Sequence, residues 1–204
     1  MDAIVRVKRL ATCAMAITLA GCVTPPTAYV THQFATVGSE QIVALQQPLR
    51  LQVVTRRYRG EQLYDDDSPW VYRGTIAALK QTQLIQPSPQ GEDGKVLVVV
   101  KEIEPTPGDT ARGAAQGMLG GLTLGAVGFT STSAFDISLE ISANGKVGTR
   151  PPVRVDINIR FGSDSVPPGL QSYRDVNDAL KQALKSAIVW TVWDMQQRGL
   201  MPVQ

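Results

Sequence analysis

Two stretches with strict two-residue alternation constrain the fold most strongly. In residues 135–141 and 153–161, apolar side chains occupy every second position and mostly polar ones stand between them. A period of two predicts strands that bury only one face, so Leu139 and Ile157 are expected to point into a core. The connection contains Asn144-Gly145, a turn-forming pair, and we expect the two strands to pair antiparallel.

Three further patterns predict the rest of the core. Residues 49–57 alternate as a strand, a helix is expected from Pro69 to about Leu84, and the apolar run 96–100 predicts a strand buried on both faces. Strand, helix and strand in this order imply a parallel pair with a right-handed crossover. A long helix is expected to begin after Ser172 as its N-cap and to end at Gly199.

These elements predict an α/β (α+β) fold. We expect a two-layer sandwich, in which a four-stranded mixed sheet carries two helices on one face. Residues 47–204 form the single predicted domain, and residues 108–133 form a glycine-rich insertion within it. The polar face of the sheet is expected to carry cross-strand pairs among its charged side chains. These are Asp136, Glu140, Arg154, Asp156 and Arg160.

The first 21 residues have the pattern of a secretory signal peptide. Three basic residues precede the uncharged segment 10–20, which ends in Leu19-Ala20-Gly21-Cys22. An apolar segment of this length is too short for the roughly 20 residues that span a bilayer as a helix. We therefore expect cleavage after residue 21 rather than a transmembrane anchor.

The tetrapeptide ending at Cys22 resembles the lipobox of bacterial lipoproteins. The resemblance implies that Cys22 becomes the first residue and carries acyl chains such as palmitate, which makes membrane lipid the expected partner. Val23 follows Cys22, and in the enterobacterial sorting rule this implies the periplasmic face of the outer membrane. Residues 22–46 are expected to form a tether. The lipobox and the element order also resemble small envelope lipoproteins, such as penicillin-binding-protein activators and the curli secretion lipoprotein.

The insertion contains a glycine every fourth residue, at Gly113, Gly117, Gly121 and Gly125, and no charged residue occurs in 113–135. On a helix these glycines would form one groove, a glycine zipper that allows another backbone to approach closely. Interior glycines disfavour a helix in water by about 1 kcal/mol each relative to alanine. Three interpretations remain open: a hairpin that enters the membrane or self-associates, a segment packed within the fold, and an exposed loop.

The residues that most enzyme chemistry needs are scarce. His32 is the only histidine and lies in the predicted tether, and Cys22 is the only cysteine after residue 21. We expect no catalytic residue, no metal site and no cofactor, because a nucleophile would lack its histidine base and zinc its ligands. The signal peptide has a net charge of +2, which equals that of the whole chain, so the mature protein is neutral. A neutral chain gives no reason to expect a nucleic-acid partner.

Two functions follow as alternatives. The first is a non-enzymatic, lipid-anchored envelope lipoprotein with a structural or assembly role, which enters the membrane or self-associates through the glycine segment. The second is a monomeric periplasmic module that binds a lipid, a glycan or an envelope protein. A homo-oligomer or an envelope protein is accordingly the expected protein partner.

Overall fold

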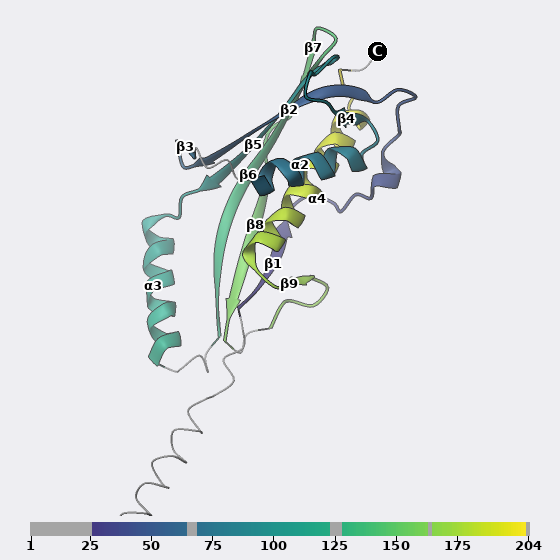
Figure 1. The fold of residues 1–204 in the computed structure, drawn as a ribbon. Helices are drawn as coiled ribbons and strands as arrows, with labels where there is room; N and C mark the ends of the chain where they lie inside the picture. Colours follow the sequence, from purple (N-terminus) through teal and green to yellow (C-terminus); the bar gives the residue numbers. More distant parts are fainter. Residues whose placement is uncertain (1–25, 65–68, 123–127, 163–164, 203–204) are drawn as a thin grey trace, which may run out of the picture.

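The computed structural model describes residues 26–64, 69–122, 128–162 and 165–202. These residues form a single mixed sheet of nine strands with three α-helices (Figure 1). The strands are β1 Thr27–His32, β2 Leu49–Arg59, β3 Gln62–Tyr64, β4 Ile85–Pro87, β5 Gly94–Ile103, β6 Phe129–Ala143, β7 Lys146–Thr149, β8 Val153–Phe161 and β9 Ser172–Tyr173. The helices are α2 Pro69–Gln81, α3 Pro107–Leu122 and α4 Val176–Gln197, with a short 3-10 helix η1 at Ser39–Gln41.

The prediction of a four-stranded sheet with two helices is therefore wrong. The four expected strands are present as β2, β5, β6 and β8, adjacent to one another in the order β3-β2-β5-β6-β8-β1-β9. The missed strands β3, β4, β7 and β9 have only two to four residues each. A two-residue period cannot be recognised over such a length, and these strands exist because a longer neighbour offers them hydrogen bonds.

The expected parallel pairing of the two strands is confirmed. β2 and β5 pair parallel, with Leu51 opposite Gly94 and Val53 opposite Val96, and α2 connects them. Burial alternates along β5, however: Val96, Val98 and Val100 are buried, whereas the residues between them are only half-buried. The expectation that this strand is buried on both faces is wrong, because the described helices that cover it lie on one side of the sheet.

The antiparallel pairing of the two alternating strands is also confirmed. Phe135 of β6 lies opposite Val155 of β8, and both Leu139 and Ile157 are buried. Asn144 and Gly145 both have positive φ, at 53° and 74°, and they form the two-residue turn from β6 into β7. The connection thus contains a strand of its own, β7, which pairs with the end of β6.

Strand β1 lies within the segment predicted as a tether. Thr27–His32 pairs antiparallel with β8 along its whole length, so the prediction of a tether is wrong for these six residues. Asn158 of β8 is buried and joins three strands through its side chain. It donates to Thr31 Oγ1 of β1 at 3.0 Å and accepts from Thr132 Oγ1 of β6 at 2.7 Å. The run Thr-Ala-Tyr-Val-Thr-His is rich in residues that favour strands, a signal that sequence reasoning missed.

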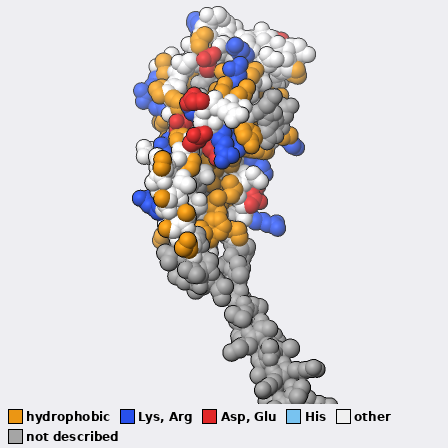
Figure 2. All heavy atoms as spheres, turned by 90° about the vertical axis from the view of Figure 1, so that its left-hand side faces the viewer, with side chains coloured by type: hydrophobic (Ala, Val, Ile, Leu, Met, Phe, Trp, Pro, Cys, Tyr) orange, Lys and Arg blue, Asp and Glu red, His pale blue; other side chains and the backbone are white. Residues whose placement is uncertain are grey.

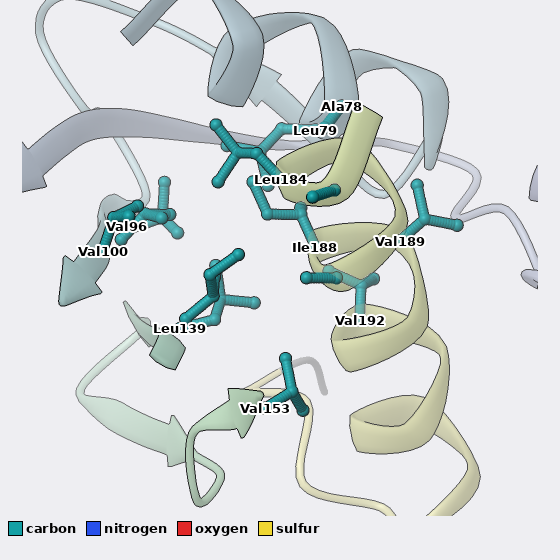
Figure 3. Packing of buried hydrophobic residues seen from close by; sticks show 14 of the residues in the cluster. Ala78, Leu79, Val96, Val100, Leu139, Val153, Leu184, Ile188, Val189 and Val192 are labelled. Atoms are coloured by element: carbon teal, nitrogen blue, oxygen red, sulfur yellow. The ribbon is translucent and has the colours of Figure 1, made fainter. Parts of the chain in front are cut away.

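Helices α2 and α4 cover the same face of the sheet (Figure 1). Their apolar side chains meet those of the strands in the main core, where Leu79, Leu184 and Ile188 face Val96 and Leu139 (Figure 3). The N-cap of α4 is Asp175 rather than the predicted Ser172, which belongs to β9. The Asp175 carboxylate accepts the backbone N–H of Asp178 at 2.9 Å.

Candidate functional site

Helix α3 lies on the other side of the sheet from α2 and α4, beside the face that they leave open (Figure 1). Its start is fixed by a capping box between Thr106 and Asp109. Asp109 Oδ2 accepts Thr106 N–H at 3.1 Å and Thr106 Oγ1–H at 2.6 Å, and Asp109 N–H donates back to Thr106 Oγ1 at 3.3 Å. These bonds from Thr106 hold the pKa of the Asp109 carboxyl below its ordinary value. The signal Thr-Pro-Gly-Asp predicts a helix start and was missed.

The side chains of α3 that the structure describes are largely exposed to solvent. Residues 107–115 are all exposed, Gln116 is half-buried, and Met118 is 70% exposed. Among the described elements, α3 makes its main contact with β6. A helix of 16 residues that gains so little from packing is marginal in water, and its glycines weaken it further.

The predicted glycine residues fall partly within this helix. Gly113, Gly117 and Gly121 recur on one face of α3, whereas Gly125 lies outside the described residues. A Cβ atom added at Gly113 would meet no atom within 4 Å, so the structure does not support packing within the fold at this position. The insertion also ends earlier than predicted, because residues 129–133 belong to β6. Within the described part of the chain, no helix is long and apolar enough to cross a membrane.

Four features lie at one end of the molecule, which we call the anchor-proximal end because Thr27, its first strand residue, is close in sequence to Cys22, the predicted lipidation site. β1 begins there at Thr27, β6 begins at Phe129 and β8 ends at Phe161, and the C-terminal part of α3, which carries Met118, lies toward the same end (Figure 1). The rings of Phe129 and Phe161 stack with their centroids 4.7 Å apart. Seen from the side of α3, hydrophobic side chains gather toward this end, whereas acidic side chains lie nearer the middle of the surface (Figure 2). Cys22 is outside the described residues, five positions before Thr27.

The open face of the sheet carries ion pairs, although not those expected. Asp136 lies opposite Arg154 in the register of β6 and β8, but the ion pair of Arg154 is with Asp156 of its own strand, at 3.3 Å. Lys101 of β5 pairs with Glu61, and this hydrogen bond raises the pKa of the lysine. The alternating pattern predicted which face these residues occupy but not which carboxylate each cation would bind.

A groove of about 720 Å³ separates the outer surfaces of α2 and α4. Trp70 and Tyr173 provide its aromatic surface, and burial raises the pKa of the Tyr173 phenol. Arg73 and Lys185 also line it. This groove is a second candidate binding site, and it was missed because its residues come from three separate segments of the sequence.

His32 is placed where a structural role accounts for it. Its ring stacks on Phe34 with centroids 4.0 Å apart, and Nδ1 donates to the Phe34 carbonyl oxygen at 2.8 Å. Phe34 in turn lies 5.2 Å from the Trp190 ring of α4. Within the described ranges, no group of three or more His, Cys, Asp or Glu side chains is placed to hold a metal ion.

No protein family and no curated protein matches the sequence. Among solved structures, the chain is similar to two dodecamers of PelC from Paraburkholderia phytofirmans. One of them, a variant, is 13% identical with a TM-score of 0.33, and the match covers 84% of this chain and 97% of the PelC chain. The other is 12% identical with a TM-score of 0.28, and the match covers 80% of this chain and 93% of the PelC chain. Similarities of this size do not establish a shared fold.

Proposed function

We propose that this protein is a non-enzymatic lipoprotein, anchored at the periplasmic face of the outer membrane through acylated Cys22, and that helix α3 assembles it with further copies of itself. The observation that carries the proposal is the exposure of α3. The side chains of α3 that the structure describes are mostly exposed in a single chain, and a helix with this composition needs a packing partner to be stable. The lipobox sequence ending at Cys22 supports the membrane location.

A second copy is a fitting partner because the glycine face is complementary to itself. Gly113, Gly117 and Gly121 recur at every fourth position of α3, a spacing that allows the backbones of two crossing helices to approach closely. Symmetric contacts of this kind use the same residues on both chains.

Substitution of Gly113 tests the assembly. A leucine at this position has open space in the single chain and raises helix propensity, so the fold should be retained. We expect Gly113→Leu to weaken association at least tenfold in analytical ultracentrifugation of the mature protein in mild detergent. Ala111→Leu is the matched control, since it adds the same side chain on the opposite face of α3 and should leave association unchanged. A native protein that stays monomeric, or equal association of both variants, contradicts the proposal.

The anchor is tested separately by labelling. Cells fed a fatty-acid analogue should label the native chain and not Cys22→Ala, because Cys22 is the only cysteine after the signal peptide. Label on the alanine variant would contradict lipidation at this residue.

The groove between α2 and α4 favours a second candidate function, the binding of a small ligand or a peptide. Trp70 and Tyr173 offer flat apolar surface beside the cations Arg73 and Lys185, and the Asp178 carboxylate in the same groove is paired with Lys181, a combination suited to an anionic ligand with a ring or chain to stack. If this function holds, Trp70→Ala should abolish binding of such a ligand while the assembly state is unchanged.

A further inference from the structure

The position of β1 sets how far the folded domain can stand from its anchor. Only four residues lie between Cys22 and Thr27, the first residue of the sheet, so the connection is five residue steps long. A fully extended chain spans at most about 3.6 Å per residue, so this connection reaches no more than about 18 Å. Once Cys22 carries its acyl chains, Thr27 therefore lies within that distance of the lipid headgroups.

The short connection also determines which end of the domain meets the membrane. Thr27 pairs with Arg160, the neighbour of Phe161, and Phe161 pairs with Phe129. Val147 of β7 lies at the opposite end, because it pairs with Ser142, thirteen residues further along β6 than Phe129. At about 3.3 Å per residue, the two ends are roughly 43 Å apart. Thr27 cannot be held near the headgroups without bringing the anchor-proximal end there too.

The chemistry of the anchor-proximal end suits a lipid interface. Met118 is 70% exposed, and the stacked pair Phe129 and Phe161 is only half-buried. No charged residue occurs in the sequence from Gly113 through Phe135, so no charge on this segment opposes its entry into an apolar medium. Tyr173 of β9 lies opposite Ala28 of β1, and the next residue, Arg174, is exposed. The Arg174 side chain is therefore close to the start of β1, where anionic headgroups would lie.

We propose that the anchor-proximal end, formed by Met118, Phe129 and Phe161, inserts into the membrane interface as a second attachment besides the acyl chains. The sheet then projects away from the bilayer, and β7 is its most distant part. This inference rests on the lipid anchor at Cys22 of the proposed function, and it names the lipid surface as a partner of the domain itself.

The test uses the single cysteine of the mature chain. Residues 22–204 are coupled through Cys22 to maleimide lipid in vesicles of phosphatidylethanolamine and phosphatidylglycerol at about 3:1, some with brominated acyl chains. Coupling supplies the anchor chemically, so the result does not depend on lipidation by the cell. The variants Met118→Trp and Val147→Trp form a matched pair, since the two native side chains are 70% and 64% exposed. The three native tryptophans contribute the same background fluorescence to both variants.

We expect brominated lipid to quench the added fluorescence of Met118→Trp several-fold more than that of Val147→Trp. Phe161→Trp provides a second reporter at the anchor-proximal end should the first variant fold poorly. Equal quenching at the two ends, or none at either, overturns the docking proposal even when Cys22 is labelled by fatty acid in cells. An unlabelled Cys22 overturns the lipid anchor and with it the proposed function, whatever the vesicles show.

Discussion

Among the charged groups that the structure describes, the Asp194 carboxylate should be the one whose removal lowers the stability of the domain most. It lies near the C-terminal end of α4 with its side chain 10% exposed, and it accepts from Nε of two arginines. Arg150, which precedes β8, is 16% exposed and also lies over the ring of Trp190, with its guanidinium carbon 4.1 Å from the centroid. Arg198 binds the same Asp194 oxygen at 2.7 Å but is 60% exposed.

Removal of Asp194 leaves the Arg150 guanidinium without its counter-ion in a largely desolvated position. Breaking one partner of a buried pair costs about 3–5 kcal/mol. Arg150 keeps its stacking on Trp190 and some contact with water. We therefore expect Asp194→Ala to lower the free energy of unfolding by about 3 kcal/mol, the lower end of this range. With a urea m-value of about 2 kcal/mol per molar, the unfolding midpoint should decrease by roughly 1.5 M.

Urea denaturation, followed by tryptophan fluorescence and circular dichroism, measures this loss. Arg198→Ala is the control, and it should cost no more than about 1 kcal/mol because the arginine is exposed. The double variant Arg150→Met with Asp194→Leu replaces the pair by apolar side chains of similar volume and should recover most of the loss. If Asp194→Ala and Arg198→Ala lose equal stability, the assignment of the effect to the desolvated Arg150 is refuted.

Three further predictions concern the sheet, a close contact and helix α3. Ile157→Ala should cost about 2–5 kcal/mol in urea melts, whereas Asp156→Ala on the open face should stay within about 0.5 kcal/mol; equal losses would contradict a sheet covered mainly on one face. Gly148→Ala would place the new Cβ atom 2.2 Å from the Leu200 carbonyl oxygen, so we expect the free energy of unfolding in urea to decrease by about 1–3 kcal/mol. Thr149→Ala is the control, because this neighbouring side chain is exposed and its removal should change the stability little. The folded-state pKa of Asp109 is lowered, so its stabilisation of α3 is complete above the unfolded pKa of about 3.9 and is lost as the pH falls through the folded value. Hydrogen-exchange protection factors in the first turn of α3 should therefore decrease below about pH 4, and a decrease of the same size in Asp109→Asn would show that this carboxylate is not the cause.

The sequence by itself determined the elements whose signal repeats locally. The alternation in β6 and β8, the crossover from β2 through α2 to β5, and most of α4 follow from periods of two and 3.6 that continue over nine or more residues. The burial of Leu139 and Ile157 follows from the same periods, since the face of a residue is fixed by its register. The Thr106–Asp109 capping signal and the strand-forming residues of β1 are also local patterns, so the sequence is sufficient to predict these two elements.

Only the tertiary structure decided how these elements are completed. The short strands β3, β4, β7 and β9 depend on hydrogen bonds from strands distant in the sequence, and no local pattern encodes such a partner. The position of α3 on the open side and the pairing of Thr27 with Arg160 depend on the assembled sheet in the same way. The sequence alone left the domain free to stand far from Cys22, the proposed lipidation site. Pairing of β1 with β8 leaves only four residues between Cys22 and the sheet, because backbone hydrogen bonds and the buried Ala28 hold the strand in place.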